Sequence, residues 1–283
     1  MLSLSGDDRI TFLQGLTTND VRKVSPERAI YSALLTPQGK YLHDFFVAAD
    51  GEALLIDCEA ARRDDLLRRL KVYRLRSKVA LDDLEGRTVV AAAFGDGVLE
   101  AFGLDRAPGS ARPFGNGGLA FVDPRLAELG VRLMLPAEGA IEALRSAGLD
   151  PAGPHDYEML RLSLGVPDGS RDLMVEKSTL MESNFDELHG IAWDKGCYMG
   201  QELTARTKYR GLVKKRLVMM TADAPLPDPG TPVLRNGKEV GELRSGHGNR
   251  AIALIRLDAL EADGGLVAGT VPVRPEKPSY VEF

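Results

Sequence analysis

Hydrophobic and polar positions in the first third of the chain follow two different periods. Runs rich in β-branched and aromatic residues predict strands at 29–35, 41–48 and 53–57. In the charged stretch that follows, Leu66, Leu70 and Tyr73 recur at a spacing of three to four residues. This spacing predicts an amphipathic helix over 60–73, so the first third combines strands with helices.

The middle of the chain repeats this alternation. β-rich runs predict strands at 78–81, 88–94, 118–122 and 131–135. Apolar positions at helical spacing predict helices at 99–102 and 138–147. The segment 106–118 is rich in Gly and Pro, which predicts a loop. No group of chemically reactive residues stands out in this section.

The last part of the chain begins with a helix and ends in closely spaced strands. The segment 155–164 predicts a helix that ends at Gly165 and Pro167. After a Pro-rich connector, short β-runs predict strands at 216–221, 232–234, 239–244, 251–257 and 271–274. The pair Asn236-Gly237 is a strong signal for a two-residue hairpin. Strands so closely spaced predict a small antiparallel barrel.

Composition narrows the function classes. The 283 residues are 44% hydrophobic and 27% charged, which is typical of a soluble globular protein with one large or several small domains. A net charge of −5 argues against a nucleic-acid partner, and the lack of a long apolar run argues against a membrane span. Two cysteines exclude a disulfide framework and suit a reducing compartment. Because the N-terminus shows no signal or transit peptide, we expect a cytoplasmic protein.

The segment 193–211, W-D-K-G-C-Y-M-G-Q-E-L-T-A-R-T-K-Y-R-G, carries the strongest candidate chemistry. Good helix formers follow Cys197, so this cysteine is expected at or just before a helix N-terminus, where the helix dipole favours an anion. Lys195 adds positive charge, and both effects would lower the pKa of the thiol. We therefore predict a functional thiol at Cys197; the alternative is a buried small apolar residue.

The octapeptide K-G-C-Y-M-G-Q-E at 195–202 closely resembles the signature of the YgfZ family, folate-binding proteins related to the glycine-cleavage T-protein. Three further blocks resemble the family in order and spacing: F-L-Q-G-L-T-T-N-D-V at 12–21, R-L-S-L-G-V-P at 161–167 and L-M-E-S-N-F-D-E-L-H-G at 180–190. The last block resembles the mitochondrial and alphaproteobacterial branch in particular. In order and spacing, the resemblance covers nearly the whole chain.

The resemblance implies an α+β, T-protein-like fold. Ferredoxin-like α+β subdomains would surround a central folate cavity, and a small antiparallel β-barrel would form the C-terminus. The implied domains are a folate-binding region at 1–215 and a barrel at 216–283. Within the first region, one subdomain would join about 1–80 with 154–215, and the other would be 81–153.

Members of this family assist the assembly of [4Fe-4S] clusters, and the resemblance implies the same function here. The implied cofactor is tetrahydrofolate or a one-carbon derivative, and the implied partners are an A-type iron–sulfur carrier protein and client [4Fe-4S] enzymes. Two cysteines cannot supply four thiolates, so Cys197 would ligate a cluster shared with a partner. Nucleic acid and membrane are not expected partners.

The resemblance also assigns roles to single residues. Glu182 falls where the family places a glutamate beside the pterin. A carboxylate can accept hydrogen bonds from the donor edge of the pterin ring. The further residues expected to bind the cofactor are Tyr198, Gln201, Glu202 and Arg206. The reactive residues would be Cys197 and Lys195, together with Asp44 in a hairpin that matches the acidic turn of the T-protein. His43 replaces one acidic residue of that turn, which puts aminomethyl transfer in doubt.

A run of positive charge follows the signature, and its role stays open between folate carboxylates, an acidic partner and a solvated face. The run comprises Arg206, Lys208, Arg210, Lys214, Lys215 and Arg216. Two functions remain. The first is a non-enzymatic, or at most weakly catalytic, accessory factor for cluster assembly that binds folate and uses Cys197. The second is a folate-dependent aminomethyl or one-carbon transferase with Asp44 as the base.

Overall fold

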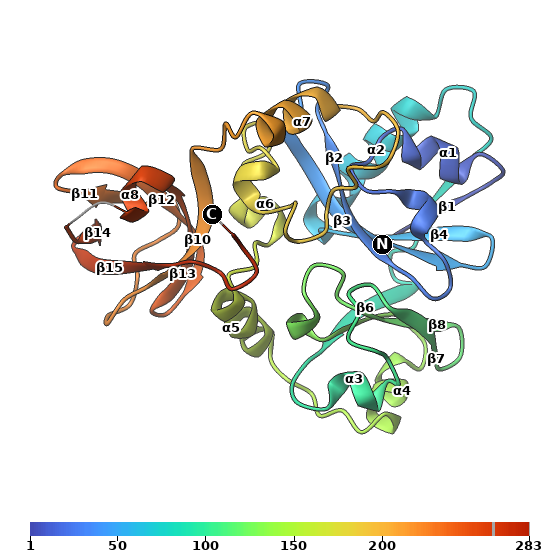
Figure 1. Cartoon of the computed structure of the whole chain (residues 1–283). Coiled ribbons are helices and arrows are strands. Elements are labelled where there is room, and N and C mark those ends of the chain that lie inside the picture. The colour runs from blue at the N-terminus through green and yellow to red at the C-terminus, as the bar shows by residue number, and fades with distance from the viewer. Residues whose placement is uncertain (262–263, 283) are drawn as a thin grey trace. The chain divides into compact units, whose positions relative to one another are not determined.

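The computed structural model describes residues 1–261 and 264–282 (Figure 1). It divides into two compact units, each built from segments that are distant in the sequence. Unit 1 comprises Met1–Pro37, Leu42–Pro151 and Leu188–Gln201, and unit 2 comprises Gln38–Tyr41, Ala152–Glu187 and Glu202–Phe283. Within the described ranges, no helix is both long and apolar enough to cross a bilayer.

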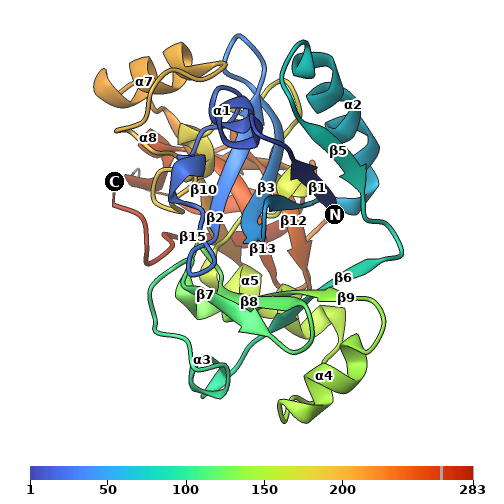
Figure 2. The ribbon, with the colours of Figure 1, turned by 90° about the vertical axis from the view of Figure 1, so that its right-hand side faces the viewer.

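The first sheet of unit 1 has the strand order β2-β3-β4-β1-β5. Its strands are β1 (Leu2–Ser5), β2 (Ile30–Leu35), β3 (Tyr41–Asp50), β4 (Ala53–Cys58) and β5 (Ala80–Asp83). The helices α1 (Arg9–Gln14) and α2 (Arg63–Arg74) pack beside these strands (Figure 2). Leu66 and Leu70 of α2 are fully buried, which confirms the amphipathic helix predicted from their spacing.

The second sheet of unit 1 has the order β6-β9-β8-β7. Its elements are β6 (Thr88–Ala93), β7 (Ala111–Phe114), β8 (Gly118–Val122) and β9 (Val131–Pro136), with the helices α3 (Val98–Ala101) and α4 (Ala140–Ser146). Strand β7 lies where the sequence predicted a loop, so that prediction was wrong at these residues. Pro113 is tolerated because β7 is an edge strand, where a missing N–H breaks no ladder.

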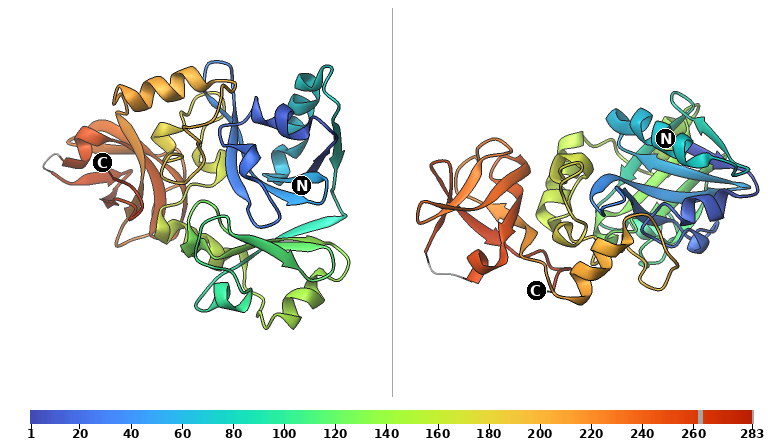
Figure 3. Two further views of the ribbon diagram at one scale, coloured as in Figure 1. Left: turned by 45° about the vertical axis from the view of Figure 1, so that its right-hand side comes forward. Right: turned by 90° about the horizontal axis from the view of Figure 1, so that it is seen from above.

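Unit 2 contains a closed barrel with the strand order β10-β13-β12-β11-β14-β15 (Figure 3). Its strands are β10 (Lys215–Thr221), β11 (Pro232–Arg235), β12 (Lys238–His247), β13 (Arg250–Arg256), β14 (Leu266–Ala268) and β15 (Val271–Glu276). The short β14, which has glycine on both sides, and the helix α8 (Leu257–Glu261) were missed by the sequence analysis. Buried Val218, Val233 and Leu243 contribute to the core of the barrel, which confirms the predicted barrel.

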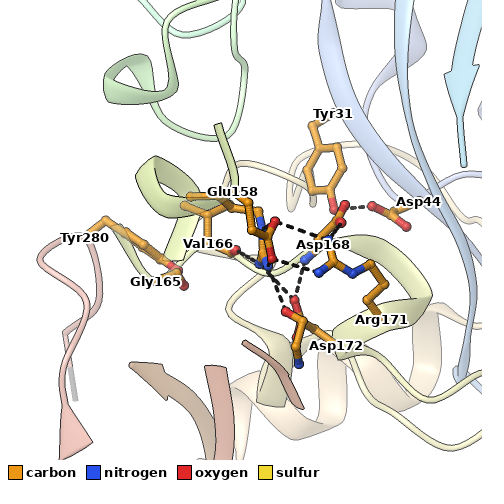
Figure 4. Close-up of polar contacts among 11 residues, drawn as sticks. Tyr31, Asp44, Glu158, Gly165, Val166, Asp168, Arg171, Asp172 and Tyr280 are labelled. Carbon is orange, nitrogen blue, oxygen red and sulfur yellow. Dashed lines mark hydrogen bonds and ion pairs between the residues drawn. The ribbon is translucent and has the colours of Figure 1, made fainter. Parts of the chain in front are cut away.

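Besides α8, unit 2 contains the helices α5 (Pro154–Leu164), α6 (Gly169–Asp172) and α7 (Gln201–Tyr209); the first residue of α7 belongs to unit 1. Arg161 of α5 is 2% exposed and joins α5, α6 and the barrel. Its guanidinium donates to Glu158 Oε1 at 2.7 Å, Val166 O at 2.7 Å, Ser245 Oγ at 2.8 Å and Asp172 Oδ2 at 3.0 Å. Arg161 therefore links the two carboxylates Glu158 and Asp172 in one ion network (Figure 4). Arg171 joins this network because it also donates to Glu158.

Candidate functional site

The segment 189–200 carries Cys197, has no regular secondary structure and lies against residues 14–19, within unit 1. The contacts are specific hydrogen bonds. Thr18 Oγ1 donates to Gly190 O at 2.7 Å, Asn19 Nδ2 donates to His189 O at 2.7 Å, and the N–H groups of Ala192 and Met199 donate to Thr18 O and Gly15 O at 3.1 Å. Hydrogen bonds therefore connect the block at 12–21 with the segment that contains the signature octapeptide. We call residues 189–200 the cysteine loop.

Lys195 connects the cysteine loop to residues 14–19 through its side chain. Its side chain is buried, and Nζ donates to Thr17 O at 2.6 Å, Asn19 O at 2.7 Å and Gln14 O at 2.9 Å. An ammonium group has three donors, so these carbonyl groups satisfy all of them. Burial lowers the pKa of Lys195 to about 8, while the nearby Asp20 opposes this shift. Lys195 therefore anchors the cysteine loop, a role that the sequence analysis did not suggest.

Cys197 is exposed, which excludes the buried alternative. Helix α7 begins at Gln201, later than the sequence predicted, so Cys197 lies outside the first helical turn, where the dipole acts most strongly. The N–H of Tyr198 donates to Gln201 Oε1 at 3.1 Å, which links the loop to the start of this helix. Apart from its two chain neighbours, no residue lies within 4 Å of a Cβ added at Gly196, so the backbone next to Cys197 is open on this side.

Cys58 is a useful contrast within the same unit. It is the last residue of β4 and is only partly exposed. Burial raises the pKa of its thiol to about 12, which disfavours the reactive thiolate. The two cysteines therefore differ in environment: Cys58 lies partly buried at the end of a strand, whereas Cys197 is exposed on a loop.

Asp44 and His43 are neighbours on β3, and neighbouring side chains of a strand point to opposite faces of the sheet. Asp44 accepts a hydrogen bond from the hydroxyl of Tyr31 at 2.7 Å (Figure 4). His43 is 2% exposed, and its Nε2 lies 2.9 Å from Asp65 Oδ2 of α2. Burial and the neighbouring Arg62 lower the pKa of His43 to about 4. His43 is therefore neutral near pH 7 and does not orient Asp44.

This pKa predicts how stability depends on pH. The unfolded chain protonates His43 near pH 6.5 and the folded chain only near pH 4, so the unfolded state binds more protons between these values. The folded state should lose stability as pH falls through this window, by at most about 3 kcal/mol. His43→Gln cannot titrate and should lose less over the same window. Urea unfolding between pH 7 and pH 4 measures the difference, and parallel curves for both proteins would contradict it.

Glu182 lies in unit 2, on the short 3₁₀ helix η4 (Met181–Ser183), and accepts a hydrogen bond from Thr179 Oγ1 at 2.8 Å. It lines a cavity of about 150 Å³ together with Lys177, Lys215 and Arg244. The side chain of Arg244 is 10% exposed, and its Nε has no partner among the described atoms. A carboxylate acceptor and a buried donor at one cavity fit a pterin, whose edge carries donors and acceptors. A whole folate needs more space, since ligands of that size occupy roughly 300–1,000 Å³.

The basic run contains both paired and solvent-exposed residues. Arg216 is buried, and its Nη1 donates to Glu187 Oε1 at 2.7 Å. Lys208 pairs with Asp186 at 2.5 Å. Both therefore serve the fold of unit 2, whereas Arg210 and Lys214 are exposed. Arg206 is half-exposed and lies 3.9 Å from the exposed Glu202 of the same helix.

The part of the chain that the structure describes contains no group of three or more His, Cys, Asp or Glu side chains placed to hold a metal ion. Cys197 is therefore not part of such a group among these residues. Tyr198 and Gln201 belong to the cysteine loop and its junction with α7, while Glu182 lines the cavity of unit 2.

Comparison with known proteins gives two kinds of likeness. Residues 214–283 match the family described as the C-terminal β-barrel domain of CAF17. The human mitochondrial iron–sulfur cluster assembly factor IBA57 is 33% identical over 278 residues, which cover 90% of this chain and 74% of the human protein. The mitochondrial IBA57 homologue of Pyricularia oryzae is 32% identical over 92% of this chain and 70% of its own length.

Among solved structures, the glycine cleavage system aminomethyltransferase T from Bartonella henselae superposes with a TM-score of 0.80 at 16% identity. The superposition covers 99% of this chain and 83% of the other. This likeness shows a shared fold and confirms the T-protein-like fold class predicted from the sequence. The predicted domain boundaries stay a prediction.

The names of the relatives correct the predicted compartment. The human, mouse and Pyricularia oryzae proteins are all mitochondrial, so the expectation of a cytoplasmic protein is wrong. A low cysteine count argues only against an oxidising compartment, and it does not separate one reducing compartment from another.

Proposed function

Because the chain belongs to the family of IBA57 iron–sulfur cluster assembly factors, we propose that it assists the assembly or transfer of [4Fe-4S] clusters through the thiol of Cys197. The cluster would be cargo, with tetrahydrofolate or a one-carbon derivative bound as an accessory ligand. The observation that carries this proposal is an exposed cysteine on a loop that a buried lysine fastens in place.

The cysteine loop suits a transient ligand for a metal cluster. Its hydrogen bonds to residues 14–19 order it in advance, so docking of a partner would cost less conformational entropy. A thiolate is a soft ligand for iron–sulfur clusters and a nucleophile in thiol exchange. One thiol occupies one ligand position, and the others would come from a partner, for which an A-type carrier protein is the proposed candidate. Client [4Fe-4S] enzymes would then receive the cluster.

The experiment that tests this function is complementation of a strain that lacks the corresponding gene. The readout is the activity of an [4Fe-4S] radical enzyme. Cys197→Ala should lose the rescue, because no other exposed thiol lies in the described part of the chain. Cys58→Ala is the matched control and should rescue as the wild type does. Equal rescue by Cys197→Ala and wild type would remove the cysteine from the mechanism.

Folate binding is the second component of the proposal. Glu182 would accept hydrogen bonds from the pterin edge, and Arg244 and the lysines of the same cavity would balance negative charge. When bound, the folate would supply a carrier for one-carbon units. Tyr198, Gln201, Glu202 and Arg206 remain proposed ligands that rest on the family resemblance.

We predict that Glu182→Gln weakens the binding of tetrahydrofolate by roughly 10- to 100-fold, the value of a hydrogen bond to a charged group. Isothermal titration calorimetry measures this directly. Glu239→Gln, an exposed position on β12, changes the same charge at a different place and should bind as the wild type does. An unchanged dissociation constant for Glu182→Gln would remove this residue from the folate site.

Aminomethyl transfer is the alternative, and one observation supports it: Asp44 is oriented by the hydroxyl of Tyr31 within a T-protein-like fold. The position of His43 on the opposite face weighs against it, because Asp44 lacks the second acidic group expected there. Release of methylene-tetrahydrofolate from an aminomethyl-lipoyl carrier separates the two functions. Turnover that Asp44→Asn abolishes and Cys197→Ala leaves intact would favour the transferase.

A further inference from the structure

The C-terminal end of α2 exposes an apolar ridge. Val72 is 65% exposed and Leu75 is 85% exposed, while Leu66 and Leu70 of the same helix face the core. Val72 lies in the last turn of α2 and Leu75 directly follows the helix, so two exposed apolar side chains lie three positions apart at its C-terminal end. We call these two side chains the α2 ridge. It lies entirely within unit 1.

Positive charge surrounds the α2 ridge. Lys71, Arg74, Arg76 and Lys78 are exposed, and none of their side chains makes an ion pair or hydrogen bond within residues 1–261 and 264–282. The whole chain carries a net charge of −5, so this concentration runs against the overall balance. A cluster of unpaired cations beside exposed aliphatic groups favours a ligand that is both acidic and apolar.

The backbone conformation of Leu75 is also unusual. Its φ is +43° and its ψ is −111°, a conformation that side chains other than glycine rarely adopt. A glycine would end the helix there without this strain. The leucine side chain is also in water, so burial does not offset the strain within the chain.

Two open hollows flank the α2 ridge. One, of about 440 Å³, is lined by Asp64, Leu67, Arg68, Lys71 and Val72. The other, of about 750 Å³, is lined by Asp8, Leu75, Arg76 and Ser77. A shallow surface of exposed aliphatic groups and cations can receive an amphipathic helix that carries acidic side chains beside its apolar face. A second copy of this chain does not fit, because a two-fold contact would place one cationic cluster against another.

We propose that the α2 ridge and its cations form a docking surface for an acidic amphipathic helix of another protein. The leucines or valines of that helix would pack against Val72 and Leu75 and enter the flanking hollows. Its carboxylates would face Lys71, Arg74, Arg76 and Lys78. This surface is separate from Cys197 and does not depend on the function proposed above.

Fluorescence anisotropy with a synthetic probe tests the proposal. The probe is a labelled peptide of about 20 residues with glutamates on one face and leucines at i, i+3, i+4 and i+7 on the other. The full-length protein should bind it, and raising the salt concentration should weaken binding. The same peptide with its leucines changed to alanine should bind at least about 10-fold more weakly, as one lost apolar contact predicts.

Two variants make the result specific to the α2 ridge. Leu75→Gly should weaken binding of the probe by about 10-fold while the midpoint of thermal unfolding stays constant or rises, because the strain is relieved. The double variant Lys71→Glu, Arg76→Glu should abolish binding at low salt. Loss of binding together with loss of fold in Leu75→Gly, or unchanged binding in either variant, would overturn the proposal. So would binding of the wild type to vesicles with about 30% anionic lipid in place of the peptide, since a membrane would then be the occupant.

Discussion

Replacing Lys195 by methionine is expected to release the cysteine loop and to reduce complementation to near the level of Cys197→Ala. The variant keeps the length of the side chain and removes its donors, so Gln14 O, Thr17 O and Asn19 O lose their shared partner. A buried acceptor left without a donor costs about 1–3 kcal/mol, and the three together exceed the stability of a surface loop.

Amide hydrogen exchange locates this effect. The N–H groups of Ala192 and Met199 donate to carbonyl groups of residues 14–19, so both should exchange at least about 100-fold faster in Lys195→Met. Amides of the barrel strands should be unaffected. Arg216→Met is the matched control, because it removes another buried cation but acts within unit 2. Unchanged protection of Ala192 and Met199 in Lys195→Met would refute the anchoring role.

Chemical rescue separates anchoring from general destabilisation. Lys195→Ala leaves room for propylammonium, which restores the missing methylene groups and the N–H donors. The added amine should recover the slow exchange of the loop and part of the complementation. Tetramethylammonium carries the same charge without N–H groups and should fail. Equal rescue by both cations would mean that charge alone, and not the three hydrogen bonds, holds the loop.

Replacing Arg161 by methionine should destabilise the protein by about 3–5 kcal/mol, the usual effect of removing one partner of a buried ion pair. Asp172 is almost fully buried and would lose its cation, and Val166 O and Ser245 Oγ would lose a donor. Urea unfolding followed by circular dichroism measures the change.

Arg171→Met is the control for this prediction, since Arg171 also binds Glu158 but is half-exposed. Ion pairs near the surface contribute little, so this variant should lose less than about 1 kcal/mol. The double variant Arg161→Met, Asp172→Asn should recover part of the lost stability, because no buried carboxylate remains unpaired. A loss below about 1 kcal/mol for Arg161→Met would show that the network is not a major source of stability.

The sequence predicted those helices and strands that are defined by residues close together in the chain. The helix α2 followed from the spacing of Leu66 and Leu70, and the barrel followed from short β-runs and the pair Asn236-Gly237. Strand β7 was hidden because its proline indicates a loop except at a sheet edge, and an edge is defined only by strands elsewhere in the chain. Strand β14 was hidden because three residues carry too little pattern.

The candidate site shows the same limit. Unusual neighbours drew attention to Cys197, and its exposure agrees with a functional thiol. The contacts of Lys195 could not be predicted, because its partners are backbone carbonyl groups between 176 and 181 residues away. Every residue has such a carbonyl, so side-chain chemistry gives no signal for it. The opposite orientations of His43 and Asp44 could have been expected from strand alternation alone.

The long separation between Lys195 and its carbonyl partners also bears on when the thiol becomes available. During synthesis the lysine is added between 176 and 181 residues after the residues that it binds, and closing so long a loop is a slow, late event. A nascent or truncated polypeptide would therefore carry the cysteine without its correct geometry. A change that disrupts residues 14–19 would therefore alter the position of the thiol, so correct presentation of the thiol requires that these distant residues have folded.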